Sequence, residues 1–227
     1  MELKAEYLKI HERAYLKLRE NGKPSWSESR DLQNRMEFCQ NIFREICLHP
    51  EAEVLVIGCG DGEICLSLAN AGSRVTGWDI SPAAIDWATE KARDRDIKAK
   101  FYEKNVCENF TSSKSYDVVL DDHCLHCIVG EDRATVLKNI RLHLKDHGYF
   151  ILRTHCGNPP PTMKKEVLDM WDPTSRCQIH KGIAGRYFGL EIEIIKEIES
   201  AGFSLRHKKV ISDTANWPML EALFCCR

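Results

Sequence analysis

The stretch EVLVIGCGDGEICLSLANAGSRVTGWDIS, residues 53–81, decides the fold. It opens with an apolar run at 54–57, whose β-branched side chains are typical of a strand buried on both faces. Gly58, Gly60 and Gly62 follow, and glycines permit a tight turn and let a ligand approach the backbone with no Cβ in the way. A helical segment then presents its N-terminal amides to that turn, and a second strand completes the unit. The stretch therefore predicts a strand–turn–helix–strand unit with a ligand site at the glycine turn.

Asp79 ends the second strand of this unit, 21 positions after Gly58. That is about the spacing at which a carboxylate meets ribose hydroxyls in a nucleotide-binding crevice. A dinucleotide fingerprint would need a third glycine at position 63, where the sequence has Glu63. No stretch reads G-x-x-x-x-G-K-[ST], so the triphosphate-binding loop is absent from the sequence. We therefore predict a cofactor that carries a nucleoside but no pyrophosphate.

The motifs GCGDG and WDIS resemble the opening motifs of the class I S-adenosylmethionine-dependent methyltransferases. The resemblance continues through AKFYEKNV, YDVVLDDHCLHCI and LHLKDHGYFILRTH, which are similar to the third, fourth and fifth strands of that family. It implies an α/β fold, Rossmann-like and doubly wound, with a mostly parallel seven-stranded sheet, an antiparallel last strand and an N-terminal helical lid. It also implies S-adenosyl-L-methionine as the cofactor and S-adenosyl-L-homocysteine as its product. Small-molecule members such as the thiopurine and tellurite-resistance methyltransferases are the most similar in type.

Nine residues match the family's cofactor-binding positions. They are Trp26, Gly58, Cys59, Gly60, Asp79, Ile80, Asn105, Val106 and Asp121. Val56 departs from the family, whose members usually carry Glu or Asp two residues before the first glycine. Either another residue helps to place the methionine portion or the affinity is lower. Asn105 stands where an Asp often meets the adenine amino group, and its amide oxygen can still accept that hydrogen bond.

The loop DDHCLHC, residues 121–127, follows the predicted fourth strand. Ligands of open α/β sheets bind beyond the carboxyl ends of the strands, so this loop is where a methyl group would be transferred. Asp122, His123 and His126 are the candidates for binding the acceptor or removing its proton, since imidazole titrates near neutral pH. The alternative for each histidine is a hydrogen-bonded loop residue that only shapes the pocket.

The same loop also allows a metal interpretation. Cys124 and Cys127 form C-x-x-C, and Cys177 with His180 forms C-x-x-H about fifty residues later, and such pairs occur in structural zinc sites. His155 ends the fifth strand and points to the same crevice. However, a catalytic loop is a poor place for a structural zinc site, and free cysteine more often behaves as a small buried apolar residue. We therefore expect no metal.

The acceptor is expected to be a small molecule. The net charge is −2 with no long block of one sign, so no nucleic-acid partner is indicated. The segment 158–161, NPPP, lacks the aromatic residue and the position of the NPP[YF] motif of methyltransferases that act on nucleic acids or proteins. Arg153, Arg176 and Arg186 would suit an acceptor with a carboxylate or another anion. They equally suit surface ion pairs.

The 227 residues are expected to form a single domain. Residues 1–50 would be a helical preface or lid, and residues 51–227 a Rossmann-like core with an irregular insertion at about 157–189. No apolar stretch approaches the roughly 20 residues that span a bilayer, and the charged first residues do not resemble a signal peptide. Eleven cysteines without an export signal suggest free thiols in a reducing compartment, so we expect a cytoplasmic protein with no membrane partner. The sequence leaves the oligomeric state open.

Two other classes of function remain open from the sequence. A nucleotide-dependent oxidoreductase would use the same βα unit, but Glu63 replaces the third glycine that it needs. A non-catalytic module that binds a cofactor or a metal is compatible with Val56 and with the cysteine-rich loop.

Overall fold

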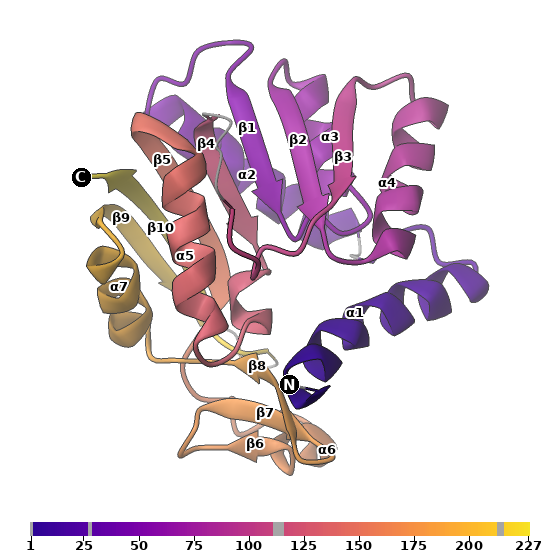
Figure 1. Ribbon diagram of the computed structural model, residues 1–227, viewed down its shortest axis with the longest axis vertical. Coiled ribbons are helices and arrows are strands. Elements are labelled where there is room, and N and C mark those ends of the chain that lie inside the picture. Colours follow the sequence, from indigo (N-terminus) through magenta and orange to yellow (C-terminus); the bar gives the residue numbers. More distant parts are fainter. Residues whose placement is uncertain (1, 27–28, 111–115, 213–215) are drawn as a thin grey trace.

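The computed structural model describes residues 2–26, 29–110, 116–212 and 216–227. Among these residues a seven-stranded sheet forms the centre, in the order β3-β2-β1-β4-β5-β10-β9 (Figure 1). Its strands are β1 (Glu53–Ile57), β2 (Arg74–Asp79), β3 (Ala99–Glu103), β4 (Tyr116–Asp122), β5 (Leu144–His155), β9 (Phe203–Ile211) and β10 (Met219–Cys226). The helices are α1 (Glu2–Glu20), α2 (Ser29–Glu45), α3 (Glu63–Asn70), α4 (Pro82–Asp94), α5 (Asp132–His143), α6 (Lys165–Leu168) and α7 (Glu191–Ser200), with a 3-10 turn η1 (Leu125–Cys127).

The sheet separates two apolar cores, and β1 shows how the sequence forms both. Leu55 and Ile57 pack on one face with side chains from α5 and α7. Val54 and Val56 alternate with them and pack on the other face with α2 and α3. Figure 1 shows α5 in front of the sheet and α2 behind it. Because both faces are covered, the strand is a continuous apolar run, and each such side chain contributes about 1.5–3 kcal/mol by its burial.

The strand order places the ligand-binding edge. β1 pairs in parallel with β2 on one side and with β4 on the other. The chain therefore reverses its direction of winding between β1 and β4, and ligands of such sheets bind beyond the carboxyl ends of the strands at that point. β10 is antiparallel to both β5 and β9. The predicted Rossmann-like sheet, mostly parallel with an antiparallel last strand, is confirmed.

The segment at about 157–189 was expected to be irregular, but part of it forms regular secondary structure. It contains α6 and a separate three-stranded sheet of β6 (Trp171–Asp172), β7 (Cys177–His180) and β8 (Ile183–Tyr187). These strands are two to five residues long and mostly half-buried. Strands this short carry too few residues for an alternating apolar pattern to be recognised. The small sheet lies below the carboxyl ends of the central strands, beside α1 (Figure 1).

The N-terminal helix α1 lies across the carboxyl edge of the sheet, as expected for a lid (Figure 1). Arg19 near its end forms an ion pair with Glu90 of α4 at 2.6 Å. Glu12 accepts a hydrogen bond from the hydroxyl of Ser81, the N-cap of α4. Helix α1 also packs on α4 through apolar side chains, namely Tyr15 and Leu18 of α1 and Ala83, Ala84 and Trp87 of α4. It therefore rests on α4 through both polar and apolar contacts.

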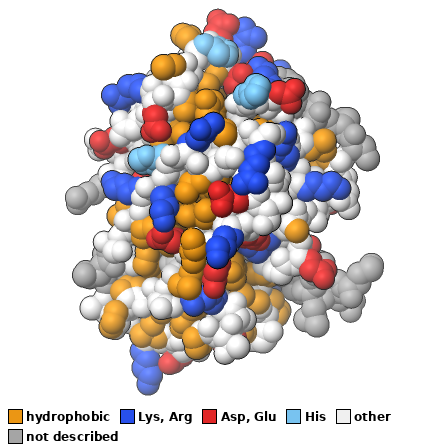
Figure 2. Space-filling model, turned by 90° about the vertical axis from the view of Figure 1, so that its left-hand side faces the viewer, with side chains coloured by type: hydrophobic (Ala, Val, Ile, Leu, Met, Phe, Trp, Pro, Cys, Tyr) orange, Lys and Arg blue, Asp and Glu red, His pale blue; other side chains and the backbone are white. Residues whose placement is uncertain are grey.

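The far edge of the sheet is polar. β9 carries the basic run Arg206–Lys209, and its residues from Arg206 onward are exposed. Charged edge strands discourage pairing with another chain. Figure 2, which faces the side with β9 and α7, shows Lys and Arg interspersed with acidic and apolar side chains. Within the described residues, no helix is both long and apolar enough to cross a membrane.

Replacement of Arg133 by alanine is expected to destabilise the fold by about 3–5 kcal/mol. Its buried guanidinium donates to the carbonyl oxygens of Leu125 and Ile128, at 2.6 and 3.2 Å, and pairs with Glu197 of α7 at 2.6 Å. The variant would leave two carbonyl groups of the η1 loop without this donor. Denaturant unfolding measures the loss, and Arg141→Ala on the same helix, where the side chain is more exposed, should change the free energy of unfolding by less than about 1 kcal/mol.

Candidate active site

The turn after β1 forms the base of the site. Gly58 and Gly60 have φ of 60° and 56°, a left-handed conformation that favours glycine. A Cβ on Gly60 would lie 2.5 Å from the hydroxyl oxygen of Tyr15, so α1 approaches this turn closely. The carboxylate of Asp79 accepts hydrogen bonds from the N–H groups of Gly60 at 2.8 Å and Ser81 at 2.9 Å. The first and second strands thus converge on one carboxylate.

Asp79 also faces a small cavity of about 80 Å³ at the carboxyl ends of β2 and β3. The predicted residues Ile80, Asn105 and Val106 line it. Asn105 uses its side-chain oxygen to accept the N–H of Cys107 at 3.0 Å, which fixes the amide against the wall. Burial raises the pKa of Asp79 to about 6, although the backbone N–H bonds oppose this. A carboxylate, an amide and apolar walls fit a nucleoside, with the carboxylate for its ribose hydroxyls.

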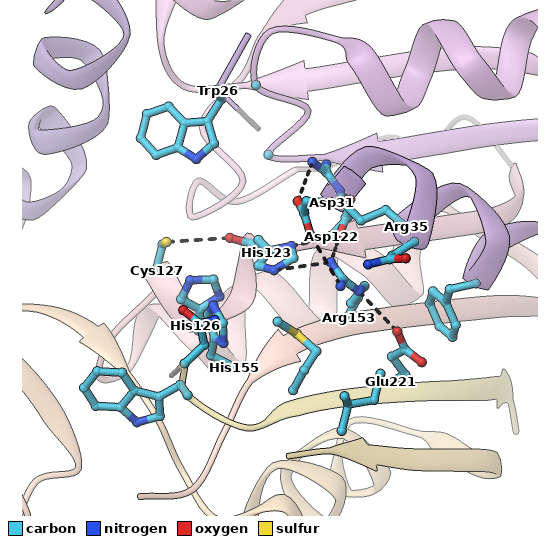
Figure 3. Close-up of a pocket in the computed structure, with 18 of the residues that line it drawn as sticks. Trp26, Asp31, Arg35, Asp122, His123, His126, Cys127, Arg153, His155 and Glu221 are labelled. Atoms are coloured by element: carbon cyan, nitrogen blue, oxygen red, sulfur yellow. Dashed lines mark hydrogen bonds and ion pairs between the residues drawn. The ribbon is translucent and has the colours of Figure 1, made fainter. Parts of the chain in front are cut away.

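A larger cavity of about 1090 Å³ adjoins the small one (Figure 3). The two cavities share wall residues, namely His11, Tyr15, Gly58, His123 and Cys127. The predicted residues Trp26, Cys59 and Gly60 line the larger cavity, with Asp122, His123 and His126. Trp26 is held there because its backbone N–H donates to the Asp61 carboxylate at 2.9 Å. The structure therefore brings the predicted cofactor and catalytic residues to one connected space.

Asp121 is the exception among the predicted site residues. It is fully buried and lines neither cavity. One of its oxygens accepts the N–H of Cys124 at 3.0 Å, and the other has no hydrogen-bond partner among the described residues. Burial raises its pKa to about 8. In strand β4 successive side chains point to opposite faces, so the neighbouring Asp122 reaches the cavity while Asp121 stays beneath the loop.

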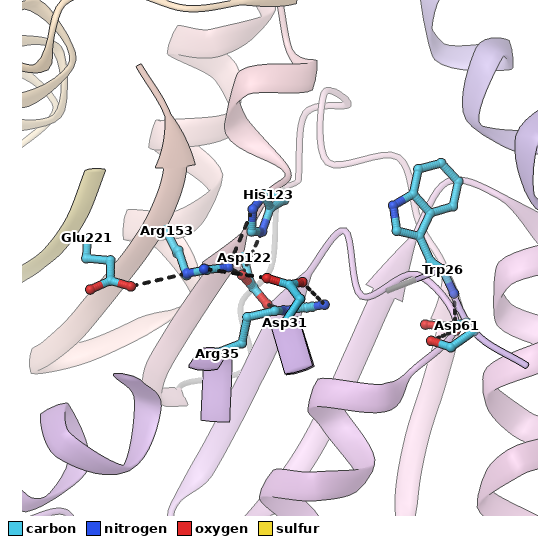
Figure 4. Close-up of polar contacts among 9 residues, drawn as sticks. Trp26, Asp31, Arg35, Asp61, Asp122, His123, Arg153 and Glu221 are labelled. Atoms are coloured by element: carbon cyan, nitrogen blue, oxygen red, sulfur yellow. Dashed lines mark hydrogen bonds and ion pairs between the residues drawn. The ribbon is translucent and has the colours of Figure 1, made fainter. Parts of the chain in front are cut away.

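Asp122 is held as an anion by two arginines (Figure 4). Arg35 of α2 donates to it at 2.5 Å, and Arg153 of β5 lies at 3.7 Å. Burial opposes its ionisation, but Arg35, with the hydrogen bond from His123, outweighs burial and holds the pKa of Asp122 well below its usual range. Arg153 is in turn paired with Glu221 of β10 at 3.2 Å. A carboxylate this acidic is a poor proton acceptor, so Asp122 is suited to positioning its neighbours.

His123 is the neighbour that Asp122 positions. Its Nδ1 lies 2.8 Å from the Asp122 carboxylate. A carboxylate accepts only, so Nδ1 carries the proton and Nε2 is the acceptor nitrogen. A guanidinium N–H of Arg153 donates a long hydrogen bond to Nε2 at 3.5 Å. His123 has φ of 74°, and a left-handed conformation in a residue with a Cβ is a form of strain that clusters at functional sites.

His126 and His155 complete a group of three imidazoles with His123. Their ring centroids lie 5.0–5.8 Å apart. Burial lowers the pKa of His126 well below its usual value and that of His155 to about 3, so both are neutral at physiological pH. Neither Nδ1 has a hydrogen-bond partner among the described residues. These two rings are weaker bases than an ordinary histidine, which favours His123 as the proton acceptor.

The cysteines of this loop are protonated thiols. Burial raises the pKa of Cys127 to about 11 and that of Cys124 well above its usual value. Cys124 packs against Gly58, where an added Cβ would lie 2.6 Å from its own Cβ. Within the part of the chain that the structure describes, no three His, Cys, Asp or Glu residues are arranged to hold a metal ion.

The site also contains residues that sequence reasoning did not single out. They are His11 on α1, Asp31 and Arg35 on α2, and Glu221 on β10. Each reaches the cavity from an element that no motif marks, so spacing in the sequence gave no signal for them. Only Arg35 has a visible pattern, as an i,i+4 partner of Asp31 at 3.7 Å.

The chain is similar to known methyltransferases. Residues 54–148 match the family model described as a methyltransferase domain. The chain is 27% identical over 208 residues to an uncharacterized methyltransferase, C70.08c, of Schizosaccharomyces pombe, covering 82% of this chain and 74% of that protein. It is 30% identical over 142 residues to a ubiquinone biosynthesis O-methyltransferase of Rickettsia conorii, covering 62% of this chain and 46% of that enzyme. The chain thus spans under half the length of the rickettsial relative.

One solved structure covers nearly the whole fold. It is the 1,6-didemethyltoxoflavin-N1-methyltransferase of Burkholderia thailandensis with its substrate and S-adenosylhomocysteine bound. The TM-score is 0.72 at 19% identity, over 97% of this chain and 89% of that chain. The methyltransferase-domain match over residues 54–148 and the shared sheet support the resemblance of this chain to the class I S-adenosylmethionine-dependent methyltransferases.

Proposed function

We propose that this protein transfers a methyl group from S-adenosylmethionine to a small molecule bound in the larger cavity. The observation that carries the proposal is the position of His123. Its ring lines both the small cavity proposed for the nucleoside and the larger cavity, and Asp122 orients it at 2.8 Å. A base at the junction of a cofactor cavity and an acceptor cavity is where methyl transfer needs one.

The cofactor-binding residues divide by the part of the cofactor they would hold. Asp79 would accept the two ribose hydroxyls, with Ile80, Asn105 and Val106 around the adenine. The turn at Gly58–Gly60 and the ring of Trp26 would surround the methionine portion, and Asp121 would act only through the loop above it. When bound, S-adenosylmethionine supplies an electrophilic methyl group on a sulfonium.

His123 would remove a proton from the acceptor atom. Asp122 fixes the tautomer, so that Nε2 faces the cavity as the lone-pair acceptor. Once Nε2 takes a proton, the anionic Asp122 stabilises the imidazolium through the bond to Nδ1. The long hydrogen bond from Arg153 to Nε2, at 3.5 Å, must be given up for this step, and the guanidinium then opposes the imidazolium charge, which favours release of the proton. His126 and His155 would remain neutral and shape the acceptor cavity.

We propose that the acceptor is a small molecule and that the protein acts in the cytoplasm. The Burkholderia structure holds 1,6-didemethyltoxoflavin, and the rickettsial relatives are named for ubiquinone biosynthesis, both of which are small molecules. The eleven cysteines are all free thiols, as a reducing compartment would keep them. A nucleic-acid partner is not part of the proposal, because the net charge is −2.

Calorimetric binding of S-adenosylmethionine and S-adenosylhomocysteine tests the proposal, with NADH as the control. Micromolar binding of the first two without NADH binding is expected. Acceptors are then sought by following S-adenosylhomocysteine formation across a library of small molecules. Binding of NADH in preference to the methyl donor would overturn the proposal in favour of a nucleotide-dependent oxidoreductase.

Affinity for S-adenosylmethionine is expected to fall as the pH drops below about 6. Burial raises the pKa of Asp79 to about 6, and only the ionised carboxylate can accept both ribose hydroxyls. Below that pH the bound state must expel a proton, so the dissociation constant rises by up to roughly tenfold per pH unit. Calorimetry between about pH 5 and 8 measures this slope. Asp79→Asn should bind S-adenosylmethionine more weakly than the wild type, and its dissociation constant should not change with pH in this range. If that variant showed the same slope, the titration would belong to another group.

A further inference from the structure

The three arginines that could bind an anionic acceptor differ in their surroundings. Arg153 is buried and already paired with Glu221, with Asp122 and Asp31 close by. Arg176 contacts Asn158 and Glu193 and does not line the larger cavity. Arg186 does line it. Of the three, Arg186 alone reaches the cavity without a carboxylate partner among the described residues.

Arg186 lies on β8, which packs against both α1 and η1. Its guanidinium acts electrostatically on the thiol of Cys127 and on three imidazoles, those of His11, His126 and His155. Burial, aided by this cation, lowers the pKa of His11 to about 4. The group around Arg186 therefore combines one permanent positive charge with neutral rings whose N–H groups can donate.

That combination is suited to an anion. A guanidinium offers a fork of N–H donors that matches the two oxygens of a carboxylate or phosphate. The Nδ1 atoms of His126 and His155 have no partner within the described residues, so either ring can add a donor. Arg186 is half-buried, and a partly desolvated cation without a counterion is costly, a cost that an anionic ligand would reduce.

We propose that Arg186 binds the anionic group, a carboxylate or a phosphate, of the methyl acceptor. This inference rests on the proposed function, since it assigns a substrate class to the same cavity. The cofactor's own carboxylate is the competing anion. Arg186 does not line the nucleoside cavity, and His126 and His155 lie away from Trp26 in Figure 3. Phe188 packs against both of these rings and stacks at 4.1 Å on Trp217, which lines the larger cavity as an aromatic surface for the body of an acceptor.

Binding of simple probes to the complex with S-adenosylhomocysteine tests this assignment. Benzoate and phenyl phosphate supply the two anions on an aromatic body, and benzyl alcohol is the neutral counterpart. In the wild type at least one anionic probe should bind tighter than benzyl alcohol. Arg186→Gln should weaken that probe roughly 10- to 100-fold and leave benzyl alcohol unchanged. Arg186→Lys keeps the charge without the forked donors, so its affinity for that probe should lie between those of the wild type and Arg186→Gln. Arg176→Gln, in the turn before β7 of the small sheet, should bind the probe as the wild type does.

The affinity for S-adenosylhomocysteine separates the two sources of the anion. It should be the same in the wild type and in Arg186→Gln. A fall in that affinity with no change for the anionic probes would assign Arg186 to the cofactor's carboxylate and overturn the proposal. Equal binding of neutral and anionic probes would also overturn it, while the methyltransferase function would stand. If the glutamine variant does not fold, as judged by thermal unfolding, the lysine variant supplies the same comparison.

Discussion

Replacing Asp79 with alanine is expected to weaken S-adenosylmethionine binding roughly 100-fold. The carboxylate is the proposed acceptor for both ribose hydroxyls, and a hydrogen bond to a charged group contributes about 1.5–3 kcal/mol. The change also removes the acceptor for the N–H groups of Gly60 and Ser81, which hold the glycine turn and the start of α4 in place. Calorimetry with S-adenosylhomocysteine measures the loss.

The isosteric variant Asp79→Asn separates these two roles. Its amide oxygen can still accept one backbone N–H, so the turn is kept while one ribose contact is lost, and an intermediate affinity is expected. Glu103, at the end of the neighbouring strand β3, is an exposed carboxylate for comparison. Glu103→Ala should leave the affinity unchanged. An alanine variant of Asp79 that binds the cofactor as tightly as the wild type would refute the ribose assignment.

The sequence predicted the first half of the sheet because its signals are local. The apolar run at 54–57, the glycines and Asp79 all fall within 29 residues, and the structure brings Gly60 within 2.8 Å of Asp79. Strand, turn and helix there follow from neighbours in the chain. The small sheet at 171–187 could not be predicted in the same way, since its strands are stabilised by pairing with one another and by packing on α1.

The sequence predicted the place of the candidate site but not the roles of its side chains. The loop after β4 lies at the carboxyl ends of the strands because parallel strands end at one edge of a sheet. The role of each side chain was not predictable. Asp122 differs from Asp121 in its ion pair with Arg35, which lies 87 positions before Asp122 in the sequence. His126 differs from His123 in being buried. Long-range ion pairs and burial set these pKa values, and neither is visible in a motif.

Replacing His123 with asparagine is expected to lower kcat roughly 10²- to 10⁴-fold, the usual contribution of a positioned general base. Asparagine is the suitable replacement because His123 has φ of 74°, a conformation that asparagine tolerates better than alanine does. The affinity for S-adenosylhomocysteine should be unchanged, since Asp79 and the glycine turn remain. A library acceptor that the wild type methylates provides the assay, with S-adenosylhomocysteine formation as the readout.

The split between kcat and cofactor affinity distinguishes a base from a merely structural residue. His123→Asn should lower kcat and keep the wild-type affinity for S-adenosylhomocysteine, whereas a structural role would lower both. His147→Asn is the matched control, because His147 is exposed near the start of β5 and has a similar φ of 64°. It should keep the wild-type rate and affinity. An unchanged kcat in His123→Asn would remove His123 as the base, and lost S-adenosylhomocysteine binding would reassign it to holding the cofactor.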